Sequence, residues 1–292
     1  MRNNYRYLRL RLIFLMIKRR KITIKKIFNL LHCYAAYLLR LKKSAASPYL
    51  INFELFNECN ERCVFCRSTR GELYDVNPQG SGYIPKGMMD FKIFQSVIRQ
   101  VKDWLIMAVP YVNGEPLLAP DIYKAIQYAT DNHIATMIAT NGILLNAQNS
   151  QKLLGAGVDF IKVHISGFTQ SSHSIEHRKG DIELIKENLR GLVRLNRQGR
   201  YGALIMLDYI LYRHNQHELK LAAKFSEELG VMFNVRPGNR KGLEEIEPPP
   251  PLLPSVVKVP CDWLWTVLTI DWDGNVFSCC DCTTWSNVSI YG

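Results

Sequence analysis

The order of apolar and amphipathic segments between Pro48 and Arg236 constrains the fold of this chain more than any other feature. Short apolar runs alternate with longer stretches in which apolar residues recur every three or four positions, as they do on helices. The predicted strands are residues 49–56, 106–112, 134–139, 159–165, 203–212 and 231–236. Strands that alternate with helices are expected to be parallel, with right-handed crossovers. We therefore predict an α/β fold, a partial (β/α)6 parallel barrel over residues 49–238.

The positive charge of the chain is concentrated at its N-terminus. Residues 1–48 hold 13 Lys and Arg and no Asp or Glu, although the whole chain has a formal charge of only +11. The rest of the chain therefore carries 24 of the 37 basic residues against all 26 acidic residues. Because this main body is close to neutral, we expect no nucleic-acid partner for it.

Residues 1–48 are predicted to form a basic amphipathic helical arm. Six apolar residues recur at helical spacing along one face, namely Ile24, Ile27, Leu31, Tyr34, Leu38 and Leu41. Three interpretations remain open for this arm: it packs on the barrel and keeps a solvated basic edge, it adheres to an anionic membrane surface, or it binds RNA or an acidic partner. The longest apolar runs are too short to cross a membrane, and no signal-peptide cleavage site follows the first of them.

Three cysteines, Cys59, Cys63 and Cys66, follow the first predicted strand with the spacing C-x3-C-x2-C. Thiolates this close together repel one another unless a metal ion or an iron–sulfur cluster takes up their charge. Three ligands would leave one iron of a [4Fe–4S] cluster open to a substrate. The alternative is a structural zinc knuckle, but it needs a fourth ligand, and the nearest histidines, His32 and His133, are distant in the sequence.

The use of cysteine also indicates the compartment. No cysteine occurs between residues 67 and 260, and the eight in the chain are clustered instead of spread in a disulfide framework. We therefore expect a cytoplasmic protein, with membrane association through the arm as the alternative.

Polar or glycine-rich turns follow the next three predicted strands. They are 113–116 (Asn-Gly-Glu-Pro), 140–142 (Thr-Asn-Gly) and 166–167 (Ser-Gly). The carboxyl ends of parallel strands meet at one edge of a sheet, so these turns are expected to lie beside the cysteine loop. On the strands themselves, His164, Asp208 and Tyr209 are ambiguous, since they could face the barrel interior or be hydrogen-bonded core residues.

The C-terminal part contains the remaining clustered cysteines. Residues 239–259 include a run of four prolines and are predicted to be a stiff linker. In residues 260–292, Asp273-Gly274 predicts a hairpin turn that would bring Cys261 back toward Cys279. Cys261, Cys279 and Cys282 could bind a second iron–sulfur cluster or a zinc ion.

The cysteine loop resembles the hallmark of radical S-adenosylmethionine (radical SAM) enzymes, in which an aromatic residue, here Phe65, precedes the last cysteine. The resemblance implies that Cys59, Cys63 and Cys66 hold a [4Fe–4S] cluster whose fourth iron is chelated by S-adenosylmethionine. In that family one electron from the reduced cluster cleaves the sulfonium to a 5′-deoxyadenosyl radical, which abstracts hydrogen from a substrate. The substrate implied is a peptide or a small molecule, and the electron donor a protein such as flavodoxin or ferredoxin.

The resemblance also assigns cofactor contacts. Residues 113–116 resemble the family's GGEP motif with its first glycine replaced, and the contact to the cofactor's amino group is carried over to Gly114, Glu115 and Pro116. Phe65 is expected near the adenine, and Ser166 near the ribose or methionyl part.

The C-terminal spacing is similar to the start of a SPASM or twitch extension. It consists of Cys261, twelve residues, Gly274, four residues and Cys279. Such extensions hold auxiliary clusters beside the substrate, and the usual later cysteines are missing here, so we expect an incomplete module. The replaced glycine and the short tail motivate the alternative function, a catalytically silent iron–sulfur or zinc-binding scaffold.

Overall fold

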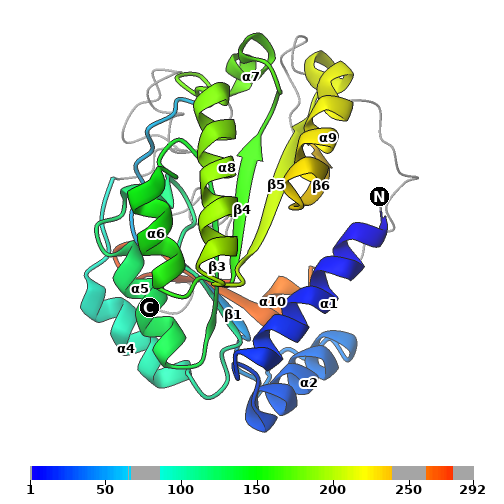
Figure 1. Cartoon of the computed structure of the whole chain (residues 1–292). Helices are drawn as coiled ribbons and strands as arrows, with labels where there is room; N and C mark the ends of the chain where they lie inside the picture. The colour runs from blue at the N-terminus through cyan, green and yellow to red at the C-terminus, as the bar shows by residue number, and fades with distance from the viewer. Residues whose placement is uncertain (1, 65, 67–85, 239–260, 279–292) are drawn as a thin grey trace, which may run out of the picture.

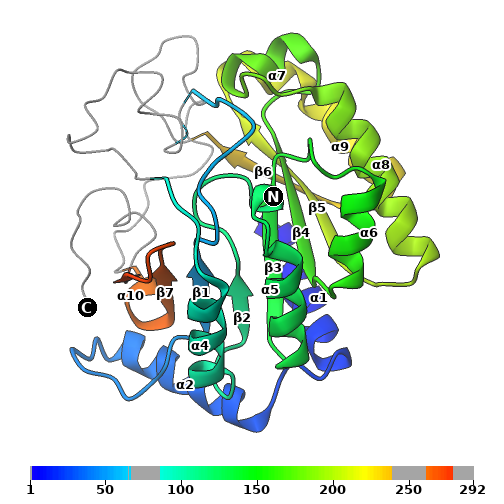
Figure 2. The same ribbon diagram turned by 90° about the vertical axis from the view of Figure 1, so that its left-hand side faces the viewer.

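A largely parallel sheet forms the centre of the protein. The computed structural model describes residues 2–64, 66, 86–238 and 261–278. Within them, eight strands are ordered β6-β5-β4-β3-β2-β1-β7-β8, and all neighbours are parallel except β7 and β8 (Figures 1 and 2). The strands are β1 (Leu50–Phe53), β2 (Met107–Val109), β3 (Ala135–Thr140), β4 (Phe160–Ile165), β5 (Leu204–Leu211), β6 (Met232–Pro237), β7 (Val267–Ile270) and β8 (Val276–Phe277). The predicted partial parallel barrel is confirmed, and the six predicted strands differ from the observed ones only at their ends.

Helices follow the strands as the alternation requires. They are α4 (Phe91–Val101), α5 (Ile122–Asp131), α6 (Ala147–Gly155), α7 (Gln170–Glu176), α8 (Ile182–Gln198) and α9 (Leu219–Leu229), with short 3-10 turns at η2 (Pro116–Leu118) and η3 (Arg213–Glu218). Local sequence sets their ends. Asp181 caps α8 by accepting a hydrogen bond from the backbone N–H of Leu184 at 3.0 Å, and Gly230 ends α9 with a φ of +62°.

The C-terminal hairpin is part of the barrel sheet. Strands β7 and β8 form the predicted hairpin, and the turn is closed by Asp271, whose carboxylate accepts the N–H groups of Asp273 and Asn275. The sequence did not predict where this hairpin lies. Strand β7, which follows the short helix α10 (Trp263–Thr266), pairs with β1 in parallel register, and so it extends the sheet past the first strand.

The two faces of β4, β5 and β6 have different neighbours. Alternate residues such as Ile161, Val163 and Leu207 belong to the main hydrophobic core. The other residues at the amino-terminal ends of these strands, Phe160, Leu204, Met206 and Met232, instead pack against Leu8 and Leu15 of helix α1 (Arg2–Lys18). We call these four strand residues the floor. Helix α1 therefore covers the amino-terminal end of the barrel's inner face.

The segment between α1 and helix α2 (Ile24–Leu38) anchors the arm to the barrel. Asp159, which is completely buried at the start of β4, pairs with Arg19 at 2.8 Å and with Lys21 at 2.7 Å. Its carboxylate also accepts the backbone N–H of Thr136 at 2.8 Å. Buried ionic groups are tolerated when they are paired and hydrogen-bonded in this way.

Helix α2 faces the barrel with the side opposite to its predicted apolar face. Its buried residues are Lys26, Asn29, Cys33 and Ala36. The predicted apolar face is exposed throughout, from Ile24 at 73% to Leu41 at 43%. The expectation that this face packs on the barrel is therefore wrong. The reason is that buried backbone carbonyl groups of the arm and barrel are satisfied by the Lys26 and Asn29 side chains, which fixes how the helix is rotated.

Neither helix of the arm spans a bilayer. Among the described residues, no helix combines the length and the apolar character that crossing a membrane requires.

The burial of Lys26 leads to a prediction about pH. Its ammonium donates to the carbonyl oxygens of Lys21 and His133, and burial lowers its pKa to about 8. Between about pH 8 and 10 the unfolded chain thus holds a proton that the folded chain has released, so this residue makes stability rise with pH. We expect Lys26→Met to lower the slope of unfolding free energy against pH by up to ~1 kcal/mol per pH unit, measured by urea denaturation. Equal slopes in the two proteins would contradict the assignment.

Candidate functional site

The cysteine loop lies directly after β1, at the carboxyl end of the sheet. Cys59, Cys63 and Cys66 are free thiols, and the backbone N–H of Cys66 donates to the carbonyl of Cys63 at 3.1 Å. The loop is attached to the segment around α7 by two backbone hydrogen bonds, from Arg62 to Arg178 and from Val64 to Glu176. These bonds hold residues 62–64 of the loop beside the segment that follows β4.

The three thiols are close enough for their charges to affect one another. The pKa of the Cys59 thiol is raised to about 12, mainly by burial, and the negative charges of Glu115 and Cys66 contribute to this increase. Burial is also the main reason that the pKa of Cys63 is raised, with contributions from Glu61, Cys66 and Cys59. A positively charged metal centre would offset this, since thiols lose their protons when they bind metal.

The turn at Gly114 packs directly against the cysteine loop. The backbone N–H of Glu115 donates to the carbonyl oxygen of Glu58 at 2.8 Å. Gly114 has a φ of +76°, and a Cβ atom there would lie 2.5 Å from the same oxygen of Glu58. Only glycine permits both the backbone conformation and this close approach.

We expect Gly114→Ala to separate this turn from the cysteine loop. The substitution introduces a clash with backbone atoms in addition to an unfavourable φ, and should cost roughly 2–3 kcal/mol of stability. Urea unfolding measures this cost, and iron retention after anaerobic reconstitution measures the effect on the loop. The matched control is Gly191→Ala on helix α8, where an added Cβ meets no atom within 4 Å and should be neutral or stabilising. Equal stabilities of the two variants would refute the close-packing argument.

Asn113, which stands in place of the first glycine of the motif, has a structural role. The side-chain amide of Asn113 donates to the Glu54 carboxylate at 2.5 Å, and both side chains are buried. Burial raises the pKa of Glu54, while the hydrogen bond from Asn113 opposes that change. The asparagine thus satisfies a buried acid at the end of β1 and leaves the turn at Gly114 intact.

Glu115 connects three turns of the site. Its carboxylate accepts hydrogen bonds from Thr140 Oγ1 at 2.8 Å, from the backbone N–H of Asn141 at 2.9 Å, and from the backbone N–H of Leu117 at 3.1 Å. Asn141 in turn donates to Asn60 Oδ1 at 2.8 Å in the cysteine loop. The turns after β1, β2 and β3 therefore meet, as the sequence predicted.

Ser166 lies at the end of β4 as expected. Its backbone carbonyl accepts a hydrogen bond from Asn215 at 2.6 Å. Its hydroxyl oxygen is buried and makes no hydrogen bond with any residue in the part of the chain that the structure describes. A buried hydroxyl without a partner is unusual in a folded protein, and it is available to a ligand.

One component of the site was not predicted. His177 Nδ1 lies 2.7 Å from Glu61 Oε2 and 3.4 Å from Cys63 Sγ, and its ring stacks on that of His173 with centroids 4.5 Å apart. Neighbouring Glu61 and Glu176 raise the pKa of His177 against the opposing effect of burial. The atoms of Glu61, Cys63 and His177 are close enough to hold a metal ion. A zinc site therefore cannot be rejected on the ground that no histidine lies near the cysteines in the sequence. No motif marks this histidine, because it reaches the loop from 114 residues away.

Several predicted residues cannot be placed. Phe65, Cys279 and Cys282 lie outside the described residues. Cys261 is described, and it is exposed ahead of α10.

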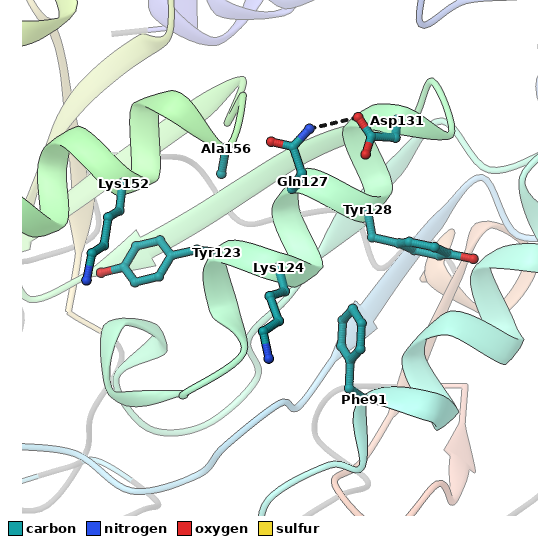
Figure 3. Close-up of a pocket in the computed structure, with 8 residues that line it drawn as sticks. All are labelled: Phe91, Tyr123, Lys124, Gln127, Tyr128, Asp131, Lys152 and Ala156. Carbon is teal, nitrogen blue, oxygen red and sulfur yellow. Dashed lines mark hydrogen bonds between the residues drawn. The ribbon is translucent and has the colours of Figure 1, made fainter.

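A separate pocket lies on the outer layer of helices, as Figure 3 shows. It is lined by Phe91, Tyr123, Lys124, Gln127, Tyr128, Asp131, Lys152 and Ala156. Most of its lining comes from α5, and its polar groups are already engaged: Gln127 donates to Asp131 at 2.7 Å, and the Lys152 ammonium lies over the Tyr123 ring. The cysteine loop and the strand ends contribute nothing to it, so it is not the candidate active site.

The arrangement around the cysteine loop matches a known family. The family model described as the Radical SAM superfamily matches residues 53–225, which is more than half of the chain. The chain belongs to the radical SAM superfamily. This family binds a [4Fe–4S] cluster and S-adenosylmethionine, as the resemblance of the cysteine loop implied.

Curated relatives of this radical SAM protein are similar over about half of their own length. An AdoMet-dependent heme synthase from Methanosarcina barkeri is 27% identical over 211 residues, covering 69% of this chain and 55% of the relative. The mycofactocin maturase MftC from Mycobacterium ulcerans is 24% identical over 207 residues, covering 69% and 52%.

Solved structures show the same fold. SuiB from Streptococcus suis, bound to S-adenosylmethionine, has a TM-score of 0.61 and 14% identity, and the match covers 84% of this chain and 64% of SuiB. The same protein bound to the precursor peptide SuiA has a TM-score of 0.60 and 10% identity, over 83% of this chain and 62% of SuiB.

The residues of the site fit the groups that the family binds. Three free thiols provide the sulfur donors that an iron–sulfur cluster requires. The unpartnered hydroxyl of Ser166 and the turn at Gly114 lie at the carboxyl ends of the neighbouring strands, where ligands of parallel α/β folds bind.

Proposed function

We propose that this radical SAM protein is an enzyme that abstracts hydrogen from a peptide. The observation that carries the proposal is the meeting of three free thiols with the turns at Gly114, Thr140 and Ser166 at one edge of the sheet. When bound, the reduced cluster supplies one electron that cleaves S-adenosylmethionine and yields the 5′-deoxyadenosyl radical. A one-electron donor protein such as flavodoxin or ferredoxin is part of the proposal.

The chain's own residues would bind and orient the two groups. Cys59, Cys63 and Cys66 would hold the cluster. The oxygens of Glu115 already accept three protein hydrogen bonds, so we assign that side chain to holding the Gly114–Pro116 turn in place for the cofactor's amino group. Ser166 Oγ would donate to the ribose or methionyl part, and Phe65 would cover the adenine. The buried side chains of Glu115 and Ser166 would help to keep water from the reacting atoms.

The support for a peptide substrate comes from the comparisons. SuiB, which has the same fold, has been solved with a precursor peptide, and the mycofactocin maturase is a relative over most of this chain. A small-molecule substrate remains the alternative within the same chemistry.

Two measurements test the proposal. Anaerobically reconstituted protein, reduced with dithionite and given S-adenosylmethionine, should form 5′-deoxyadenosine. Addition of a peptide fraction from cells grown in deuterated water should then give deuterium-labelled 5′-deoxyadenosine. A label that arises only with the small-molecule fraction of the same cells would refute the peptide, and no 5′-deoxyadenosine despite bound iron would favour the silent scaffold.

We also propose that the chain belongs to the SPASM/twitch branch and that Cys261, Cys279 and Cys282 bind an auxiliary cluster. The support is the spacing from Cys261 through Gly274 to Cys279 and the joining of β7 to β1, which attaches this part of the chain to the barrel. Iron content and Mössbauer spectra of the wild type and Cys261→Ala test this. Identical iron content would count against the second cluster.

A third proposal concerns the arm, which we propose contacts an anionic membrane surface. Of the 19 large apolar residues that are exposed in the described structure, 13 lie between Tyr7 and Leu41. Eight exposed basic residues accompany them, namely Arg9, Arg11, Lys18, Arg20, Lys25, Arg40, Lys42 and Lys43, and residues 1–48 contain no acid. Apolar residues combined with basic ones favour anionic lipid headgroups over an acidic protein alone.

The position of the arm is compatible with this contact. Helices α1 and α2 lie at the end of the sheet opposite to α7 (Figures 1 and 2). A membrane at that end would leave the carboxyl ends of the strands, where the candidate site lies, open to a substrate. We expect co-sedimentation with vesicles that contain phosphatidylserine and little with phosphatidylcholine alone. The double variant Phe14→Asp, Phe28→Asp should lose binding, while Leu221→Asp, on exposed α9, should keep it. Equal sedimentation with both lipids would contradict the electrostatic part.

A further inference from the structure

Five polar residues lie on the inner face of the barrel, one level with the floor and four beyond it. They are Lys162 and His164 on β4, Asp208 on β5, and Asn234 and Arg236 on β6, and we call them the inner-face cluster. The strand register pairs His164 with Asp208 and Asp208 with Asn234. Each is two or four residues beyond a floor residue of its own strand, and alternate residues of a strand share a face. All five side chains are therefore on the same face of the sheet as the floor, and they lie nearer to the carboxyl ends of the strands.

Asp208 organises this cluster. It is fully buried, and its carboxylate pairs with Arg236 Nε at 2.9 Å and accepts a hydrogen bond from the amide of Asn234. His164 Nε2 lies 3.4 Å from the same carboxylate. The positive charges around it hold the pKa of Asp208 below its usual value despite burial, so it is a carboxylate at neutral pH.

The inner-face cluster contains more hydrogen-bond donors than the carboxylate of Asp208 can accept. Lys162 is half-buried, its ammonium forms no hydrogen bond or ion pair with any described residue, and burial lowers its pKa. His164 Nε2 is buried and likewise makes no hydrogen bond within the described chain. A buried polar atom without a hydrogen-bond partner costs free energy, so His164 Nε2 is available to a ligand, and the half-buried ammonium of Lys162 has donors free beside it.

The cluster also adjoins the cysteine loop. Val64 of the loop packs on Ile210, which is two residues beyond Asp208 on β5, and on Tyr212, which directly follows that strand. A group bound at the cluster would therefore lie beside the radical site of the proposed function.

We propose that Lys162, His164 and Arg236 bind a carboxylate group of the substrate, while Asp208 and Asn234 orient Arg236. With one acid against a Lys and an Arg, the cluster has a net charge of +1 when His164 is neutral, which suits an anion. In a peptide this carboxylate is either the C-terminus or an Asp or Glu side chain. The inference rests on the proposed function, because it assigns the substrate of that same site.

Binding can be measured without turnover. The probes are N-acetylglycylglycine and its C-terminal amide, titrated into the reconstituted full chain at constant ionic strength while Tm is followed. We expect saturable stabilisation by the acid alone, and about a tenfold weaker affinity in Lys162→Met and in Arg236→Gln. Arg99→Gln, an exposed charge loss on α4, should bind like the wild type. Equal stabilisation by acid and amide, or unchanged affinity in both cluster variants, would overturn the proposal.

Two further readouts separate the remaining explanations. Lys162→Met removes an unpaired ammonium, so its Tm without ligand should equal or exceed that of the wild type, and a large fall would show a structural role instead. Substrate-free formation of 5′-deoxyadenosine by both variants is then measured over a range of S-adenosylmethionine concentrations. A rise in the KM for S-adenosylmethionine would assign the cluster to the cofactor's carboxylate and overturn the substrate assignment.

If the wild type forms no 5′-deoxyadenosine but binds the acid selectively, only the proposed function fails. An N-acetyl-aspartate amide probe then distinguishes a side-chain carboxylate from a C-terminal one.

Discussion

Cys63→Ala is expected to abolish both cluster retention and cleavage of S-adenosylmethionine. Cys63 lies in the centre of the loop, where its sulfur contacts Glu61 at 3.3 Å and His177 at 3.4 Å. Because ligands that hold one cluster act as a unit, loss of one should lower 5′-deoxyadenosine formation by more than about a thousandfold. Visible absorbance, iron content and product formation by mass spectrometry measure the effect.

The matched control for this prediction is Cys33→Ser. Cys33 is also a free thiol, and it is buried on α2, where its sulfur donates to the carbonyl of Ser47 at 3.2 Å. A serine keeps that hydrogen bond, so iron content and activity should stay close to those of the wild type. If Cys63→Ala retained iron and still cleaved the cofactor, the assignment of this loop would be incorrect.

Much of the barrel follows from the sequence because its signals are local. The apolar spacing of α8 and the Gly230 stop after α9 arise from residues that are neighbours in the chain. By contrast, the parallel pairing of β7 with β1 joins segments more than 200 residues apart, and no local pattern specifies it. The same holds for the face that α2 turns to the barrel, because Lys26 donates there to the carbonyl of His133, 107 residues away.

The candidate site divides in the same way. The turns at Gly114, Thr140 and Ser166 were predicted to meet the cysteine loop because strand order places them on one edge. The contacts that complete the site were not predictable, since His177 pairs with Glu61 across the fold and Asn113 serves a buried Glu54 that no motif marks. The role of a polar residue beside a family motif can therefore be assigned only when its buried partner is known.

Asp159→Ala is expected to cause the largest loss of stability in the protein, by about 3–5 kcal/mol. The substitution leaves the ammonium of Lys21, which is only 2% exposed, without its acid, and it also removes the acceptor of the Thr136 N–H. Arg19 loses its only ion-pair partner in the described chain but keeps carbonyl acceptors at Gly157, Val158 and Tyr201. Urea denaturation measures the change in unfolding free energy.

A second ion pair between the arm and the barrel provides the control for Asp159. Lys25 and Asp103 lie 3.1 Å apart, but both side chains are more than half exposed, so Asp103→Ala should cost less than about 1 kcal/mol. Equal costs for the two variants would show that burial of the Asp159 pair does not matter. If Asp159→Ala unfolds in two steps, the first step should expose the floor, because Asp159 and the floor together hold the arm on the barrel. Dye binding to apolar surface, followed along the urea titration, would then rise before the sheet is lost, and the arm would be a separately releasable part of the fold.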